Sequence, residues 1–273
     1  MPADALAFTL AAAFLHAFWN ILIARAKDSQ AATAVMLVIA LVAFAPVAAA
    51  TWRFDDRAIP FIAVTSFLQL GYTVLLATAY RRAELSVVYP IARGTAPVIV
   101  LLVGVAILGT GSSPHQAIGV VLVGVGVLLV RGLRRAADRT GVLFGLAIAV
   151  FIAGYTLVDK HGIQYAAPFV YLELSMLVPG LGYSAYLARQ RGWQSLRAEV
   201  GPATALAGLA TFGAYGLVLA ALERAPAAAV AAVRETSIVI AAGFAAIVLH
   251  ERVGPLRLGG AVLVVTGVAL ISL

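Results

Sequence analysis

Apolar runs of about twenty residues, each long enough to cross the hydrocarbon core of a bilayer as a helix, repeat from one end of the sequence to the other. Only 11% of the 273 residues are charged, whereas soluble domains average roughly 25%. The sequence therefore predicts an all-α, multi-pass integral membrane protein, and the runs leave no stretch for a soluble domain. There is no cysteine, which excludes disulfides and thiolate metal sites.

Charged clusters, glycines and prolines divide the apolar residues into ten predicted transmembrane helices. The longest stretch with a single charge, residues 85–130, exceeds one span, and the breakers in residues 109–114 divide it in two. The polar residues 159–162 are expected to end the sixth helix, and the ninth helix is expected to be continuous. The predicted spans are residues 5–24, 31–52, 60–80, 85–108, 115–130, 140–158, 168–187, 202–222, 227–249 and 256–273.

The two halves of the sequence align with each other. Five spans per copy is an odd number, so tandem copies must cross the membrane in opposite orientations, as in many secondary transporters. We expect two inverted five-helix repeats, residues 1–135 and 136–273. The aligned pairs are Phe8 with Phe144, Trp19 with Tyr155 and Asn20 with Thr156 at one shift, then Arg93 with Arg234, Pro114 with Pro255, Gly119 with Gly260 and Gly126 with Gly267 at a slightly larger one.

On these features the chain resembles the ten-helix EamA-type members of the drug/metabolite transporter superfamily. The resemblance rests on the two copies, on Ala83 and Ala225 after the third and eighth spans, and on residues 249–252 (LHER) followed by Gly260 and Gly267. It covers nearly the whole chain, and it implies a transporter.

Three short segments refine that resemblance. Residues 109–111 (GTG) depart from it, because such proteins often carry a glutamate there. Residues 16–20 (HAFWN) and 89–94 (YPIARG) are similar to a subgroup associated with phosphonate utilisation. The family as a whole moves amino acids, metabolites and drugs, so the resemblance names no single substrate.

The basic residues predict the orientation. Of the 19 lysines and arginines, thirteen lie in connections after odd-numbered spans, and four lie after even-numbered ones: Arg53, Arg57, Lys160 and Arg224. Cytosolic loops carry the basic excess, so we expect the odd connections in the cytosol and both termini outside. The net charge of +7 fits a membrane with an anionic face, such as a bacterial inner (plasma) membrane, and not nucleic acid.

Two arginines lie inside apolar runs, where a charge is costly and usually faces a cavity or a partner. Arg93 is nine residues past Glu84, or about 13 Å along a helix, and Arg234 is eleven residues past Glu223, or about 16 Å. Because their helices start from opposite faces, the two arginines are expected to flank the midplane, where inverted repeats place a substrate. The alternative for Arg93 is a structural pin, bonded to backbone carbonyls or to Glu173.

Two carboxyl groups accompany the arginines. Glu235 follows Arg234 directly, and adjacent side chains on a helix diverge by about 100°, so each is expected to need another partner. Glu173 lies in the seventh span and is expected to be neutral, because burial disfavours its charged form. It is either a proton carrier or a hydrogen-bonding side chain, and both glutamates are candidates for carrying a coupling proton or for meeting an ammonium group.

Further polar and aromatic side chains are candidates for the wall of the site. His16 and Asn20 share one helix face with Trp19 beside them, and they either join two helices by a hydrogen bond or contact a ligand. Tyrosines on the third, fourth, sixth and eighth spans are either cavity lining or ordinary packing: Tyr72, Tyr89, Tyr155 and Tyr215.

Motifs of enzymes are missing from the sequence, which has no metal-binding histidine pair, nucleophile elbow or phosphate-binding loop. We therefore expect no cofactor and no catalysis, but a secondary transporter that moves a small anionic or zwitterionic metabolite by alternating access. A proton or another ion is the expected driving partner. The alternative is a flippase for an amphipathic or lipid-linked substrate, which requires a cavity open sideways to lipid.

Overall fold

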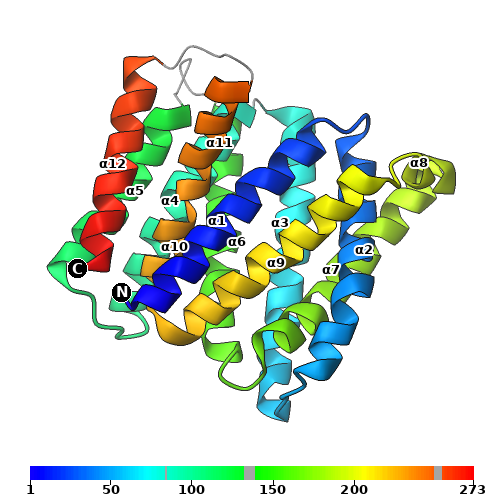
Figure 1. Cartoon of the computed structure of the whole chain (residues 1–273), viewed down its shortest axis with the longest axis horizontal. Helices are drawn as coiled ribbons and strands as arrows, with labels where there is room; N and C mark the ends of the chain where they lie inside the picture. Colours follow the sequence, from blue (N-terminus) through cyan, green and yellow to red (C-terminus); the bar gives the residue numbers. More distant parts are fainter. Residues whose placement is uncertain (84, 132–138, 249–253) are drawn as a thin grey trace.

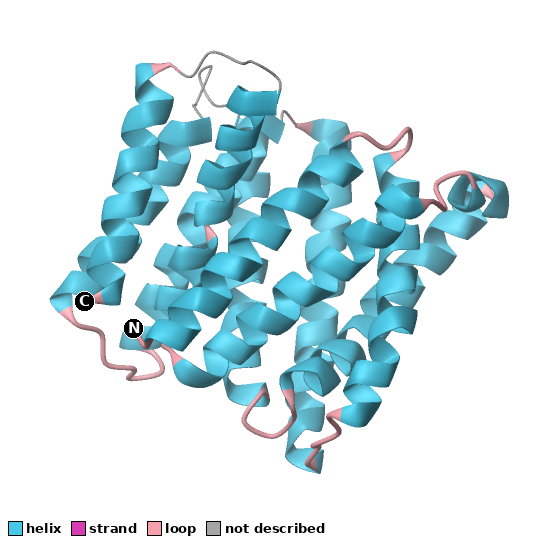
Figure 2. Ribbon diagram, in the orientation of Figure 1, coloured by secondary structure: helices cyan, strands magenta, loops and turns pink. Residues whose placement is uncertain are grey.

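The computed structural model describes residues 1–83, 85–131, 139–248 and 254–273. The predicted turn at Glu84, the middle of the basic linker and the closing motif at residues 249–252 lie outside them. Regular structure in the described ranges is helical throughout (Figure 2). The helices are α1 Ala3–Ala24, α2 Ser29–Ala50, η1 Asp56–Ala58, α3 Ile59–Arg82, α4 Leu85–Ala106, α5 Pro114–Arg131, α6 Arg139–Gly162, α7 Pro168–Arg191, α8 Trp193–Arg197, α9 Pro202–Arg224, α10 Ala227–Arg234, α11 Thr236–Val248 and α12 Pro255–Ser272.

Seven of the described helices are long and apolar enough to cross a bilayer: α1, α2, α3, α4, α6, α9 and α12. The prediction of a multi-pass all-α membrane protein is confirmed in this form. Prolines lie at the start of α5, α7, α9 and α12, where a backbone N–H has no hydrogen-bond partner within the helix. For these four helices the prolines marked the start, and all predicted helix starts are correct to within two residues.

Helix ends differ more from the sequence prediction. The helix α6 continues through residues 159–162, and α3 includes Arg82. The prediction that residues 159–162 end the sixth helix is therefore wrong. A basic residue in the last turn, such as Lys160, interacts favourably with the negative, carbonyl end of the helix dipole. The helix can therefore continue beyond its apolar part. The short helix α8, in the predicted polar loop, was not expected.

The ninth predicted span is not one helix. The helix α10 ends at Arg234, and α11 begins at Thr236, with Glu235 between them. The Glu235 N–H donates to the Ala232 carbonyl at 3.0 Å, and the Ile238 N–H donates to the Glu235 carbonyl at 3.0 Å. Both bonds are i to i−3, the tighter pattern that marks a local departure from the α-helix.

Helices of the two halves pack against each other in reciprocal pairs (Figure 1). The helix α1 packs on α9, while its counterpart α6 packs on α3, the counterpart of α9. Similarly, α4 packs on α6, and α1 packs on α10 and α11. The helices α2 and α7 pair with each other, as do α5 and α12. This exchange of partners is the pattern of a pseudo-two-fold axis between the halves.

Glycines bring α5 and α12 into backbone contact. A Cβ at Gly119 would lie 2.6 Å from the Gly267 carbonyl oxygen, and one at Gly126 would lie 2.7 Å from that of Gly260. Any larger residue would force the helices apart, so these glycines permit close packing, as the sequence suggested. The contacts are reciprocal, because the sequence aligns Gly119 with Gly260 and Gly126 with Gly267.

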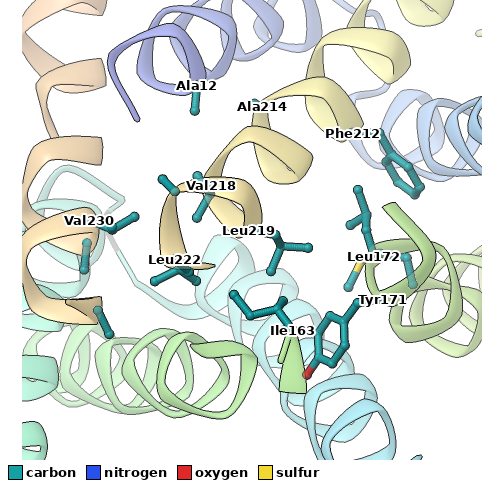
Figure 3. Packing of buried hydrophobic residues seen from close by; sticks show 14 of the residues in the cluster. Ala12, Ile163, Tyr171, Leu172, Phe212, Ala214, Val218, Leu219, Leu222 and Val230 are labelled. Carbon is teal, nitrogen blue, oxygen red and sulfur yellow. The ribbon is translucent and has the colours of Figure 1, made fainter. Parts of the chain in front are cut away.

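The largest cluster of buried apolar residues in the described chain joins both halves (Figure 3), and much of it lies toward the end of the molecule where the chain termini are (Figure 1). It combines α1, α7, α9 and α10 and includes Tyr171, Phe212, Leu219 and Leu222. The connections after α2, α6 and α9 are at this end, which we call the even face. A bridge between Phe54 and Ala166 and an ion pair from Arg53 to Glu223 at 3.2 Å join neighbouring connections there.

The opposite, odd face carries the connections after α1 and α7. Asp28 caps α2 by accepting from the Gln30 and Ala31 N–H groups, and Arg191 at the end of α7 pairs with it at 2.6 Å. Burial raises the pKa of Asp28, but the hydrogen bonds from Ala31 and Arg191 outweigh it and hold the pKa below its usual value. The Asp28 carboxylate therefore links the ends of two helices from different halves.

Candidate functional site

Arg93 lies at the centre of a buried polar cluster. It is on α4 and only 6% exposed. Its Nη1 donates to Glu235 Oε1 at 3.1 Å, and its Nη2 lies 2.5 Å from His16 Nε2. Since arginine has no acceptor, His16 Nε2 accepts this bond, and the neutral ring carries its hydrogen on Nδ1. The Tyr89 hydroxyl is 3.5 Å from Nη2, and the guanidinium carbon is 5.5 Å from the centre of the Tyr89 ring.

Glu235 is shared by the two arginines. Its side chain is buried, and its Oε1 also lies 3.8 Å from Arg234 Nε. Arg93 and Arg234 come from different halves, so one carboxylate connects the halves at the break between α10 and α11. The expectation that Arg234 and Glu235 each need a further partner fits this geometry. Glu173 was one partner considered for Arg93 in the alternative of a structural pin, but the carboxylate that pairs with Arg93 is that of Glu235.

Two buried polar atoms of this cluster have no hydrogen-bond partner among the described residues. They are Arg234 Nε and Glu235 Oε2. An unpaired buried polar group costs roughly 1–3 kcal/mol. Such atoms at a helix break are therefore the groups that a polar ligand would satisfy.

Aromatic residues surround the arginine cluster. The Trp19 ring meets the edge of His16 with centroids 5.0 Å apart, and its buried Nε1 also has no hydrogen-bond partner in the described chain. Asn20 donates to the His16 carbonyl of its own helix at 2.7 Å, so this bond lies within α1, and no hydrogen bond among the described residues joins its amide to a second helix. A small hollow of about 10 Å³ beside Arg93 is lined in part by Tyr72 and Tyr89.

A row of tyrosine rings leads away from Arg93. Tyr72 contacts Tyr155 edge-on at 6.4 Å, and Tyr155 contacts Tyr215 edge-on at 6.2 Å. The rings belong to α3, α6 and α9, so the predicted tyrosines of both halves come together. Tyr155 and Tyr215 also pack against apolar core residues, and they serve packing and lining at once.

The Tyr215 hydroxyl bonds to a second buried carboxylate, which the sequence analysis did not identify as part of the site. Asp159 on α6 is fully buried. It accepts hydrogen bonds from Thr65 Oγ1 at 2.7 Å and from the Tyr215 hydroxyl. The Tyr171 hydroxyl is 2.8 Å from Thr65 Oγ1. Asp159 follows Tyr155 by four residues and so shares its helix face. The sequence prediction did not use this spacing, because it placed the end of the helix at residues 159–162.

Glu173 lies on α7, away from the paired arginine. Its side chain is half-buried, and its Oε2 has no hydrogen-bond partner among the described residues. Two residues further along α7, the Ser175 carbonyl accepts a hydrogen bond from the Ser66 hydroxyl of α3 at 2.9 Å. The expected part of Glu173 in the site is therefore not supported by a contact with either arginine.

The model of the EamA-like transporter family matches residues 4–132 and again residues 139–273. This chain belongs to the EamA-like transporter family. The match over two repeats confirms the resemblance to EamA-type members of the drug/metabolite transporter superfamily. The protein is accordingly an integral membrane transporter with two EamA repeats.

A comparison of structures gives the same fold. One solved structure, described only as the crystal structure of a protein, superposes with a TM-score of 0.79 at 14% identity, over 100% of this chain and 99% of the other. None of the curated proteins matches the sequence. The family is thus established, and the chemistry of this EamA-like protein must be argued from its own residues.

Proposed function

We propose that this EamA-like protein is a secondary transporter that moves a small anionic or zwitterionic metabolite by alternating access. In this proposal the chain crosses the membrane ten times, with α10 and α11 forming one broken span, and its five-helix repeats are inverted. The inverted orientation is supported by the reciprocal helix pairs and by the odd number of spans in each copy.

The observation that carries the proposal is the Arg93–Glu235–Arg234 cluster at a helix break between the repeats. Inverted-repeat transporters bind substrate near the midplane, where broken helices expose polar backbone and side chains. Two guanidinium groups offer paired N–H donors to a carboxylate, phosphonate or phosphate. Glu235 supplies the opposite charge for an ammonium group, which is why zwitterions belong to the proposed substrate class.

The packing favours one state of the alternating cycle. The buried cluster that joins the halves includes Ile163, Tyr171 and Leu222 near the even face, and in the proposed cycle we assign this conformation to a state closed on that face. The basic-residue bias favours an even face that lies outside the cytosol of a bacterial inner membrane, together with both termini. A reporter that is active only outside the cytosol, fused after Leu273, is expected to be active. Activity of a cytosol-dependent reporter at the same position would reverse the orientation.

The binding role of the arginines is tested with conservative substitutions. Purified protein is screened for thermal stabilisation by amino acids, carboxylates, phosphates and phosphonates. For the compound that raises the melting temperature most, Arg93→Lys and Arg234→Lys are expected to weaken binding about tenfold or more. Lysine keeps the charge but loses the planar pair of donors, and a hydrogen bond to a charged group contributes roughly 1.5–3 kcal/mol.

The control is Arg57→Lys, in an exposed ion pair with Asp55 on the even face. It should bind the same compound as tightly as the wild type does. If Arg93→Lys and Arg234→Lys melt at lower temperature without ligand but keep the full ligand-induced shift, the arginines are structural pins, and direct substrate contact is excluded.

A further inference from the structure

The hydrogens around Asp159 point toward its carboxylate. The Thr65 hydroxyl donates to Asp159 and so uses its only hydrogen, and the Tyr171 hydroxyl donates to Thr65 or to Asp159 itself. Gln69 Nε2 donates to the Tyr215 hydroxyl at 3.0 Å, which leaves the tyrosine hydrogen for Asp159. Both chains of donors thus end on the carboxylate, an arrangement that suits its ionised form, which only accepts.

A proton on Asp159 changes this arrangement. The protonated carboxyl is a donor, so Thr65 or Tyr215 has to reverse its hydrogen to accept from it. Each of these hydroxyls already bonds to a further side chain, Tyr171 or Gln69, so the neighbouring hydrogens have to turn as well. The partners come from α3, α7 and α9, so proton binding rearranges hydrogen bonds between these helices and α6 near the even face.

Asp159 is also linked to the central cluster through Arg234. The Arg234 guanidinium interacts electrostatically with Asp159, and its Nε lies 3.8 Å from Glu235 Oε1. The charge of Arg234 therefore acts on both carboxylates, while Glu235 is bonded directly to Arg93. If Asp159 loses its charge, Arg234 keeps a positive charge that is only partly compensated. Its unpartnered Nε then favours an anion.

We propose that Asp159 is the binding site of the coupling proton, and that its protonation strengthens the binding of an anionic substrate group at Arg234. This inference rests on the proposed transport function and names the residue through which transport is driven. It assigns to Asp159 the part that the sequence suggested for Glu173 or Glu235. Proton and anion bind cooperatively, and by linkage each raises the affinity for the other by the same factor.

Other titratable and charged groups near Asp159 do not replace it. Tyr171 and Tyr215 are hydrogen donors in the closed arrangement, and Tyr155 faces the same cluster one turn away. Lys160, next along α6, donates to the Leu222 and Ala225 carbonyls at the end of α9. His161, two residues along α6, bonds through Nδ1 to the Leu157 carbonyl of the same helix. The hydroxyls and the lysine are engaged as donors, which leaves the carboxyl as the acceptor of a proton in this cluster.

The first experiment measures the affinity of the best anionic compound between about pH 8 and about pH 5. Because the protonated form binds more tightly, wild-type affinity is expected to rise as pH falls, by up to tenfold per pH unit. Asp159→Asn mimics the protonated carboxyl, and its affinity is expected to be high and independent of pH. Asp55→Asn, an exposed carboxyl on the same face, is the matched control and should keep the wild-type slope.

The second experiment needs no folded variant. In weakly buffered solution with a pH indicator, addition of the compound to wild-type protein should remove about one proton per molecule bound from the solution, at a pH where Asp159 is ionised. In vesicles, Asp159→Asn should lose accumulation driven by a pH gradient, whereas Asp55→Asn should keep it.

The outcomes separate the two proposals. Wild-type binding without pH dependence or proton uptake would overturn the role of Asp159 and leave the transport function standing. A normal pH slope in Asp159→Asn, with a flat one in Glu173→Gln, would move the proton site to Glu173. If wild-type protein neither binds nor exchanges any of the anionic compounds, the proposed function fails, and this inference fails with it.

Discussion

The helix that carries Arg93 and the segment that carries Arg234 occupy equivalent positions in the two repeats, but only the second of them is broken. The helix α4 contains two prolines, Pro90 and Pro97, and is nevertheless continuous. The equivalent segment has no internal proline and breaks at Glu235. Proline is the usual cause of a helix irregularity, so local propensity would place the break in the wrong repeat.

The residue after each arginine explains the difference. In the first repeat it is Gly94, and a Cβ there would lie 2.9 Å from the Gly124 carbonyl oxygen of α5. In the second repeat it is Glu235, whose carboxylate cannot remain in an apolar helix contact without a partner. The break brings this carboxylate to both arginines. The residue after the arginine therefore permits a close helix contact in the first repeat, as Gly94, and supplies the counter-charge in the second, as Glu235.

The largest effect is expected from removing that counter-charge. Glu235→Gln leaves two buried arginines without their shared carboxylate, and breaking a buried ion pair from one side costs about 3–5 kcal/mol. Arg93→Met should cost less, because Glu235 keeps Arg234 at 3.8 Å. Thermal unfolding of the purified variants in detergent measures both losses.

The double variant Arg93→Met with Glu235→Met serves as the control for this pair. It removes both charges and should recover most of the stability that Glu235→Gln loses. Equal stability of the wild type and Glu235→Gln would show that the carboxylate does not hold the repeats together, and the contrast between the two segments would lose its explanation.

A smaller loss of stability is expected from a substitution at Gly94. Gly94→Ala adds a methyl group against a backbone oxygen, and overpacking of this kind costs typically about 1–3 kcal/mol. Gly243→Ala on α11, where nothing lies within 4 Å of the added atom, should leave stability unchanged or raise it by about 0.5–1 kcal/mol. Unfolding measurements that rank the two alanines equally would exclude a close helix contact at Gly94.

The sequence was sufficient to predict the membrane class and most helix bounds, because hydrocarbon thickness and charge set the length of each apolar run. It also placed Arg93 and Arg234 in equivalent positions. It could not predict that Glu235 would bridge them, since that contact joins residues 142 positions apart. A break without proline or glycine leaves no local signal, and the regular apolar pattern of residues 227–249 concealed it.

Asp159 was missed for a related reason. A charged residue beside Lys160 and His161 has the composition of a loop, and only the tertiary structure places three hydroxyl-bearing side chains around it. The spacing of four residues between Tyr155 and Asp159 indicated only that the two side chains share a helix face. The hydroxyl donors come from α3, α7 and α9, so no single segment of sequence could have indicated them.

The reciprocal glycine contact between α5 and α12 has a consequence for the history and assembly of the chain. Gly119 meets Gly267 and Gly126 meets Gly260, so each half offers the other the same patch that it receives. Such a self-complementary surface is the kind that two identical subunits form around a two-fold axis. A single ancestral half could have dimerised through it before duplication joined two copies. Two separately synthesised halves of the present protein still carry both sides of this contact.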